Sequence, residues 1–227
     1  MKKIALSLGM ALTASLMTAT SANAAGFTVT ASQGGCGDPG CTSKVPGAQT
    51  IDFNSGVAPT TGFAQYSFTP GTHIYQGSTS SVSATPFQDT TKYLTLSTNG
   101  GYANQATINF SGLTSYFGLY WGSIDNYNYI DLYRGGTKLQ TIGGADVTSQ
   151  FASWTNVNSN LYVNIFANSA AYNFDKVVLR STGIAFETDN HAYLAARPVP
   201  LPGMAVGAVV AGLGLLARKR QQKSASA

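Results

Sequence analysis

Short runs of alternating apolar and polar residues follow one another from residue 25 to residue 197, and clusters of Gly, Asn, Ser and Pro separate them. An alternation with a period of two is typical of a strand with one buried face, and the clusters between the runs are typical of tight turns. No apolar stripe of helical period and useful length interrupts the pattern. The body of the chain is therefore expected to be all-β.

Eleven runs are long enough to predict strands. They lie at residues 27–31, 49–53, 64–68, 93–97, 106–110, 116–121, 129–134, 137–141, 161–166, 174–180 and 184–187. One-sided faces such as that of Leu161, Val163 and Ile165 favour antiparallel sheets packed face to face. We predict an antiparallel jelly-roll-like β-sandwich over residues 25–197, with a closed barrel as the alternative.

The pair Gly135-Gly136 predicts a two-residue hairpin, because both central positions of a type I′ turn need a positive φ. If Arg134 faces Thr137, then Leu132 faces Leu139 and Ile130 faces Thr141. The two strands would then agree on which face is buried.

Charge is scarce and is concentrated at the ends of the chain. Only 10% of the 227 residues are charged, while 11% are aromatic, which argues against both a cytosolic helical protein and charge-driven disorder. The formal net charge of +4 comes from Lys2, Lys3 and the last ten residues, because residues 25–197 carry seven basic and nine acidic side chains. We therefore expect no nucleic-acid partner.

Residues 1–24 have the order of parts of a signal peptide. Lys2 and Lys3 precede an apolar stretch, and small residues ending in Ala22-Asn23-Ala24 follow it. We expect cleavage by signal peptidase before Ala25 and export of the protein. The alternative is an uncleaved membrane anchor.

Residues 198–227 form a Pro-rich step, an uncharged hydrophobic segment predicted to be a helix, and a basic tail. The hydrophobic segment would contact the membrane in the precursor, and the basic tail would stay in the cytoplasm. This segment resembles the PEP-CTERM sorting signals, and most closely their VPLPA-type variant, in which Ala stands in place of Gly203. The residues that carry the resemblance are Val199, Pro200, Leu201, Pro202 and Gly203, followed by Arg218, Lys219 and Arg220.

The resemblance implies recognition by an exosortase-type membrane protease, which cuts near the Pro motif and transfers the protein to the cell surface or the extracellular matrix. A permanent single-pass anchor is the alternative. Residues 120–128, 144–146, 174–178, 183–187 and 189–190 also look like the body of exosortase-dependent surface proteins, which implies no catalytic residues.

Cys36 and Cys41 are the two cysteines of the chain, and Asp38-Pro39-Gly40 between them predicts a turn. Export and this turn favour a disulfide that fixes one loop. The spacing is not that of a redox pair. A zinc site would need both His73 and His191 as further ligands.

The chain has no Gly-rich phosphate loop, nucleophile elbow or HExxH motif, so we expect no catalytic residues, no cofactor and no metal. A glycoside hydrolase would need two carboxylates, and Glu187 with Asp189 or another Asp is the set to consider. His73 and His191 are expected to be ordinary hydrogen-bonded residues. A non-catalytic envelope or matrix protein is favoured over a hydrolase.

Carbohydrate binding is the nearer alternative. Aromatic faces stack on sugar rings while Asp and Asn bind hydroxyls, so Trp121, Asp125, Tyr127 and Tyr162 are the candidate glycan-binding residues. Tyr93, Tyr133 and Tyr162 fall on the predicted non-core faces. Trp121 has a competing place in the core beside Phe117 and Leu119. Calcium through Asp125, or through Glu187 and Asp189, is a further alternative without a supporting motif.

Overall fold

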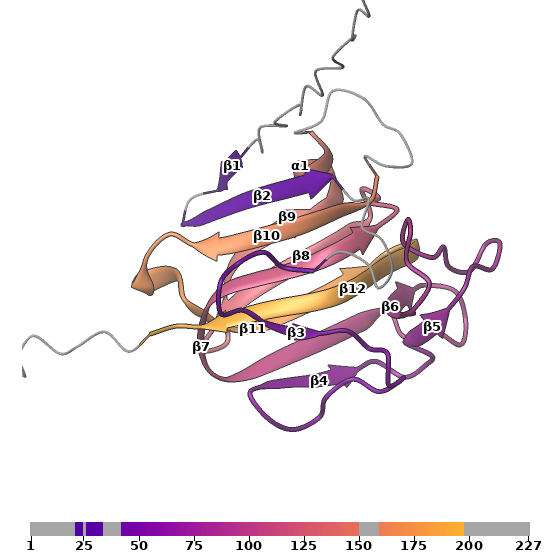
Figure 1. Ribbon diagram of the computed structural model, residues 1–227, viewed down its shortest axis with the longest axis horizontal. Coiled ribbons are helices and arrows are strands. Elements are labelled where there is room, and N and C mark those ends of the chain that lie inside the picture. Colours follow the sequence, from indigo (N-terminus) through magenta and orange to yellow (C-terminus); the bar gives the residue numbers. More distant parts are fainter. Residues whose placement is uncertain (1–20, 25, 34–41, 150–158, 198–227) are drawn as a thin grey trace, which may run out of the picture.

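The computed structural model of the chain describes residues 21–24, 26–33, 42–149 and 159–197 (Figure 1). These residues form antiparallel strands with one short α-helix and one 3-10 turn, which confirms the all-β fold class. The elements are β1 (Ser21–Ala24), β2 (Phe27–Gln33), β3 (Gln49–Ile51), β4 (Ala64–Phe68), β5 (Ile74–Gln76), β6 (Lys92–Ser97), β7 (Gln105–Gly122), β8 (Asn128–Arg134), β9 (Thr137–Gly143), α1 (Gly144–Thr148), β10 (Leu161–Ala167), η1 (Ala170–Tyr172), β11 (Phe174–Ser181) and β12 (Ile184–Ala195).

Several sequence predictions lie outside the described residues. They are the Cys36–Cys41 disulfide, the sorting segment 198–227 and most of the signal peptide. The last residues of the predicted signal peptide are described, and they form β1, which pairs with β2 so that Ser21 lies opposite Thr30. No helix among the described residues is long and apolar enough to cross a membrane.

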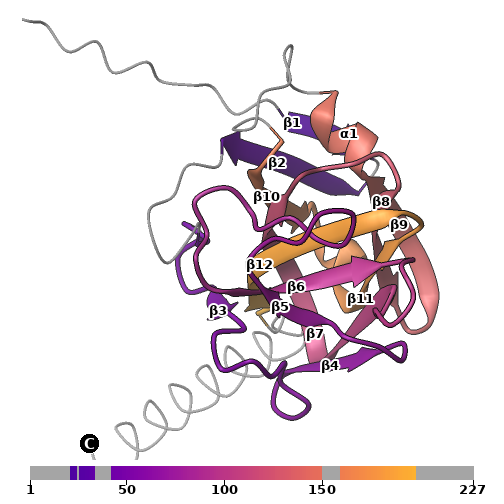
Figure 2. The same cartoon turned by 90° about the vertical axis from the view of Figure 1, so that its right-hand side faces the viewer.

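β7 organises the fold because its two halves pair with different strands. The first half pairs with β4 and β11, and the second half pairs with β10 and β12. We name the strands β1, β2, β10, β12, β3, β6 and β5, together with the second half of β7, array A. The first half of β7 forms array B with β4, β11, β8 and β9. Figure 2 shows the two arrays from the side.

The two arrays share one apolar core. The ring of Phe27 in array A lies 6.2 Å from that of Phe174 in array B, and the ring of Phe110 in array B lies 5.6 Å from that of Tyr193 in array A. The predicted buried faces belong to this core. Its members include Val29, Leu94, Leu96, Ile108, Leu119, Leu132, Leu161, Val163, Ile165 and Leu179.

The β8–β9 hairpin forms at Gly135-Gly136, where both residues have a positive φ. Arg134 lies opposite Thr137, as predicted. Beyond the next pair a bulge shifts the register, so that Ile130 lies opposite Ile142 and Leu132 lies opposite Gln140. The predicted pairs of Ile130 with Thr141 and Leu132 with Leu139 are therefore wrong, because one extra residue in β9 brings the apolar Ile142 to the core face instead.

β12 is much longer than the strand predicted at residues 184–187. The polar run after Phe186, which lies mostly beyond the predicted strand, stays in the sheet and is buried. Asn190 has a φ of 48° at a register shift between β12 and β7, where the strand is irregular. Polar side chains thus enter the interior along β12, where period-two patterning does not predict them.

Candidate functional site

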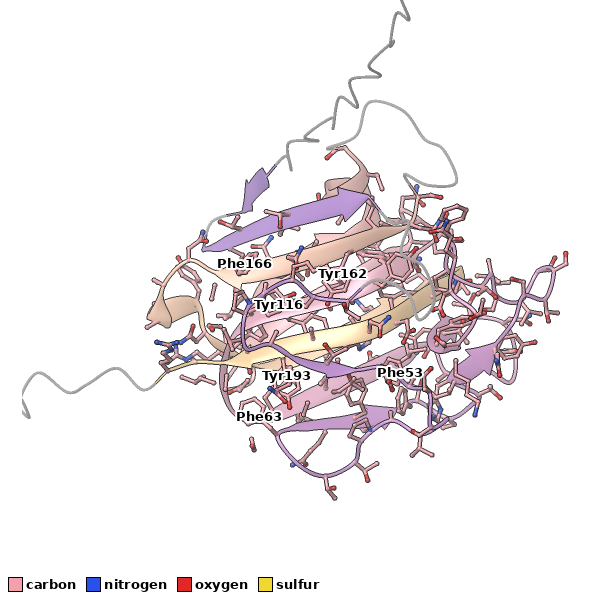
Figure 3. All side chains as sticks on the ribbon, viewed as in Figure 1. Phe53, Phe63, Tyr116, Tyr162, Phe166 and Tyr193 are labelled. Atoms are coloured by element: carbon pink, nitrogen blue, oxygen red, sulfur yellow. The ribbon has the colours of Figure 1, made fainter. Side chains whose placement is uncertain are left out.

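Two of the four candidate glycan-binding residues are buried. Trp121 is fully buried in the core, as its competing interpretation required. Tyr162 is 3% exposed, and its hydroxyl donates to the carbonyl of Asn190 over 3.1 Å (Figure 3). Neither ring can stack on a sugar from solvent, so the expectation that Tyr162 lies on a free face is wrong.

The burial of Tyr162 has a clear cause. The face of array A that points away from the core, here called the outer face, is covered by other parts of the chain. Tyr162 lies opposite Tyr120 across the sheet, and the Tyr116 hydroxyl nearby is 2.7 Å from that of Ser43. Tyr93 is buried on the same face. Long-range covering of this kind leaves no mark on the alternation pattern.

Residues 77–91, here called the covering loop, lie over the outer face of array A. The Tyr120 hydroxyl donates to the carbonyl of Phe87 over 2.6 Å, and the Phe87 amide donates to Asn160 Oδ1 over 2.9 Å. A Cβ on Gly122 would come within 2.9 Å of Pro86, so the loop and the sheet touch closely there. The covering loop therefore buries side chains of the outer face that the alternation pattern predicts to be exposed.

A hollow of about 270 Å³ opens beside this loop. Six of its twelve lining residues carry hydroxyl groups, and two carry carboxyl groups. The lining residues are Ser78, Thr79, Ser80, Ser81, Val82, Ser83, Ala84, Ser123, Asp125, Ile184, Ala185 and Glu187. This set comes from the covering loop, the end of β7 and the start of β12, and it includes Asp125 from the predicted site.

A small hairpin of the covering loop forms one wall of the hollow. The Thr79 amide donates to the carbonyl of Ser83 over 2.9 Å, and Ser81 takes a φ of 59° at the tip. The Ser83 hydroxyl lies 2.9 Å from the hydroxyls of both Tyr93 and Thr95. The wall is therefore anchored by hydroxyl groups to β6, which leaves Ser80 and Ser81 exposed at the mouth of the hollow.

Glu187 lies at the base of the hollow and is 2% exposed. Its Oε1 accepts a hydrogen bond from the Ala84 amide over 2.8 Å, whereas its Oε2 is buried without a partner. Burial, together with the nearby charge of Asp125, raises the pKa of Glu187 to about 7. The carboxyl group therefore holds a proton over part of the neutral range.

Asp125 lies at the rim, on the segment that follows β7. The Tyr127 hydroxyl is 2.7 Å from Asp125 Oδ2 and 2.6 Å from the carbonyl of Ile184. Burial raises the pKa of Asp125. The Tyr127 ring packs against Gly183, where a Cβ would come within 2.5 Å of the ring. Tyr127 therefore supports the Asp125 segment from behind and does not line the hollow.

A second hollow of about 480 Å³ lies beside the Asp125 segment. It shares Ser123 and Asp125 with the first hollow and is otherwise lined by Ile124, Asn126, Ala145, Thr148 and Ser159. Ser123 and Asp125 therefore line both hollows.

The two histidines have different surroundings. His191 is fully buried, with Nδ1 2.9 Å from the Tyr66 hydroxyl and Nε2 2.8 Å from the Thr188 hydroxyl. Burial lowers the pKa of His191 to about 3. His73 stacks on Phe68, with the ring centroids 3.7 Å apart. Both nitrogens of His191 have hydroxyl partners, which is the ordinary structural role expected for it.

Sequence reasoning found Asp125 and named Glu187, but it missed the serine wall. The signal was present in the Ser-rich run of residues 78–83. Comparison of the chain with known protein families, with curated proteins and with solved structures finds no match.

Proposed function

We propose that the protein is a non-catalytic, exported surface protein that belongs to the cell envelope or the extracellular polysaccharide matrix. Residues 1–24 would be removed by signal peptidase. Residues 198–227 would be processed by an exosortase-type protease that recognises Val199, Pro200, Leu201, Pro202 and Gly203. The support for this step is the order of the two terminal segments, which leaves the mildly acidic body outside the cytoplasm.

We further propose that the β-rich body, a jelly-roll-like sandwich, binds an exopolysaccharide through the hollow of about 270 Å³. The observation that carries this proposal is the lining, in which serine hydroxyls lie beside the carboxyl of Asp125 while Glu187 is buried beneath them. Hydroxyls and carboxylates are the partners that sugar hydroxyls need. A small, solvent-facing hollow desolvates few ligand atoms, so affinity would be in the micromolar to millimolar range.

The state of Glu187 supports binding over hydrolysis. A general acid must reach the glycosidic oxygen within hydrogen-bond distance. One oxygen of Glu187 is engaged by the Ala84 amide and the other is buried, so neither is presented to a ligand in the hollow. A pKa near 7 would suit a general acid, and for that reason hydrolysis belongs among the outcomes of the test.

The test is a glycan array with the exported protein, followed by titration calorimetry on any ligand found. Asp125→Asn and Ser80→Trp should each weaken binding at least about tenfold, through a lost charged hydrogen bond and a filled mouth respectively. The matched controls are Asp52→Asn and Ser67→Trp, at exposed positions outside the lining. Equal binding by all four variants would reject the hollow. Glycan cleavage that Glu187→Gln abolishes would replace binding by hydrolysis.

A further inference from the structure

A second pair of carboxyl groups lies under the covering loop, outside the lining of the hollow. Asp189 belongs to β12 and lies opposite Tyr120 on β7. Asp89 ends a turn of the loop in which its amide donates to the carbonyl of Pro86 over 2.9 Å. The Thr91 hydroxyl lies 2.6 Å from Asp89 Oδ1 and 3.3 Å from Asp189 Oδ2, so the two carboxyls flank one hydroxyl.

Both side chains are buried and each has one oxygen without a partner. Asp89 is 5% exposed and Asp189 is 0% exposed. Thr91 satisfies Asp89 Oδ1 with its amide as well as its hydroxyl, whereas Asp89 Oδ2 and Asp189 Oδ1 accept no hydrogen bond. Burying two carboxylates without a counter-charge is strongly unfavourable.

The electrostatics of Asp189 agree with this geometry. Burial, and then the nearby negative charge of Asp89, raise the pKa of Asp189 to about 9. A shared proton would neutralise one of the two charges, and a divalent cation would neutralise both.

We propose that Asp89 and Asp189 bind a calcium ion through their two free oxygens. Calcium takes six to eight oxygen ligands, including carbonyls, hydroxyls and water. Among the described residues no group of three or more His, Cys, Asp or Glu side chains is placed to hold a metal, so the further ligands must be neutral oxygens. The Thr91 hydroxyl, which contacts the other oxygen of each carboxyl, is one such group. This composition suits a hard cation and disfavours metals that prefer nitrogen or sulfur.

The ion would tie the covering loop to β12. Gln88 and Thr90, on either side of Asp89, are exposed, so the pair lies directly beneath the surface and a small movement of the loop would admit the ion. The same loop carries the serine wall of the hollow. Calcium would therefore hold that wall in place, although sugar binding is not needed for the proposal. The calcium proposal depends on the proposed function in one respect only, which is that an exported protein would meet calcium outside the cell.

The experiment measures the thermal unfolding and the calorimetric titration of the purified chain after EDTA treatment and dialysis, with CaCl₂ as the probe. With calcium about a hundredfold above its Kd, the midpoint Tm should rise by about 5–10 °C, and EDTA should reverse the rise. Asp89→Asn and Asp189→Asn should each remove most of this shift. Asp52→Asn, which removes an exposed carboxylate, should keep it.

Three results would overturn the proposal. The first is no calorimetric heat and no change in Tm at 10 mM CaCl₂, in which case a proton is shared by the two carboxyls. The second is an undiminished calcium shift in both variants, which places the ion elsewhere. The third is an equal shift with MgCl₂ that the variants do not reduce. Because these readouts need no glycan, failure of the glycan array leaves them unaffected.

Discussion

His191 is a buried polar residue whose burial couples the stability of this fold to pH. The residue is fully buried between hydroxyl partners, and its pKa in the folded state is lowered to about 3. In the unfolded chain the pKa returns to about 6.5. The unfolded state therefore binds more protons than the folded state between these two values.

We predict that the contribution of His191 to the free energy of unfolding falls as the pH drops below about 6.5, by about 1.4 kcal/mol per pH unit until pH 3 is approached. Glu187 and Asp189 act in the opposite direction, because their raised pKa values favour the protonated folded state. The slope must therefore be compared with that of His191→Gln in urea unfolding from pH 7 to pH 4. An identical slope in the variant would contradict the prediction.

Tyr162 tests the covered outer face at a single residue. Since the ring is 3% exposed and packs with Tyr120, Tyr162→Ala should destabilise the protein by about 3–5 kcal/mol. Tyr162→Phe keeps the ring but removes the hydrogen bond to the Asn190 carbonyl, and should cost about 1 kcal/mol. Tyr133→Ala, on a half-buried ring, is the control and should cost less than Tyr162→Ala. Chemical denaturation measures these changes in the free energy of unfolding. An unchanged stability of Tyr162→Ala would mean that the outer face is free, which would contradict the prediction.

At the scale of elements, the sequence predicts strands well wherever one face is apolar and the other polar. β4 begins and ends where expected, and β8, β10 and β11 differ from prediction by a residue or so at an end. The pattern fails where both faces are covered. Residues 106–110 and 116–121 become one strand, and β12 continues through buried Asp189 and His191. Buried polar residues imitate turns in a sequence because their partners come from distant segments.

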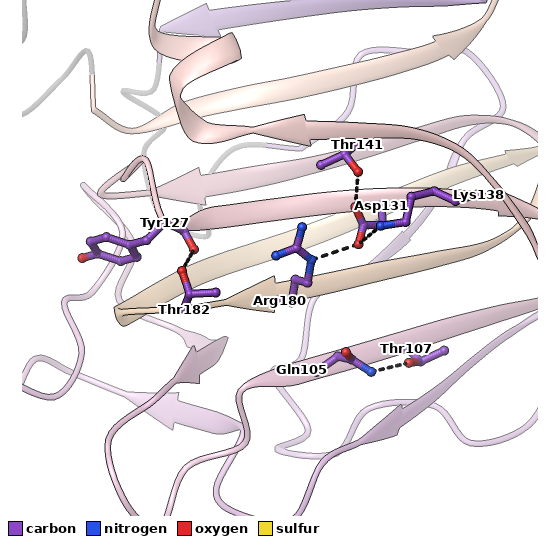
Figure 4. Close-up of polar contacts among 8 residues, drawn as sticks. All are labelled: Gln105, Thr107, Tyr127, Asp131, Lys138, Thr141, Arg180 and Thr182. Atoms are coloured by element: carbon purple, nitrogen blue, oxygen red, sulfur yellow. Dashed lines mark hydrogen bonds and ion pairs between the residues drawn. The ribbon is translucent and has the colours of Figure 1, made fainter.

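A buried carboxylate ties three strands of array B together. Asp131 on β8 is 2% exposed and lies 2.9 Å from Arg180 Nε on β11 and 3.1 Å from Lys138 Nζ on β9 (Figure 4). Burial alone would raise its pKa, but the hydrogen bonds from Arg180, Thr141 and Lys138 outweigh burial and lower the pKa. The stabilisation is therefore present at neutral pH and is lost as the pH falls through the folded-state pKa.

We predict that Asp131→Asn destabilises the protein by about 1–3 kcal/mol at pH 7, because it leaves two half-exposed cations without their partner. The penalty should shrink as the pH falls from about 4, the unfolded-state pKa, through the lowered pKa of Asp131 in the folded state, where the wild-type carboxyl is protonated as well. Asp52→Asn is the exposed control and should change stability by less than about 0.5 kcal/mol. Guanidinium unfolding at pH 7 and pH 3.5 measures both effects, and a penalty that does not depend on pH would exclude the ion pair as its cause.

At the scale of the whole molecule, the candidate site depends on contacts that the sequence pattern cannot predict. The sequence predicts Asp125 as a candidate glycan-binding residue and Glu187 as a carboxylate that a hydrolase would use. The serine wall joins them only because the covering loop folds back across array A, held by bonds such as that of Tyr120 to the Phe87 carbonyl. Tyr162 was assigned to a free face because a strand pattern does not say which sheet face a distant segment will cover. Trp121 lies in the core beside Phe117 and Leu119, as its competing interpretation required.

The two ends and the cysteines lead to one prediction for the mature protein. Intact-mass spectrometry of the exported protein should find Ala25 at its N-terminus and no residues from Gly203 onward. The mass should be two hydrogens below that of the reduced chain, because Cys36 and Cys41 are expected to be bonded. A mass that includes the hydrophobic tail would favour a permanent anchor, and ready alkylation of both thiols without reductant would exclude the disulfide.

The most direct test of the proposed glycan binding is to map a bound glycan onto the protein by NMR. On titration with the strongest array ligand, amide shifts should concentrate at residues 78–84, 123–125 and 184–187, and Asp125→Asn should reduce them. Residues of array B far from the hollow, such as those of β4, should not shift. Shifts confined to other parts of the surface, or saturating binding that leaves these three segments unchanged, would contradict the account.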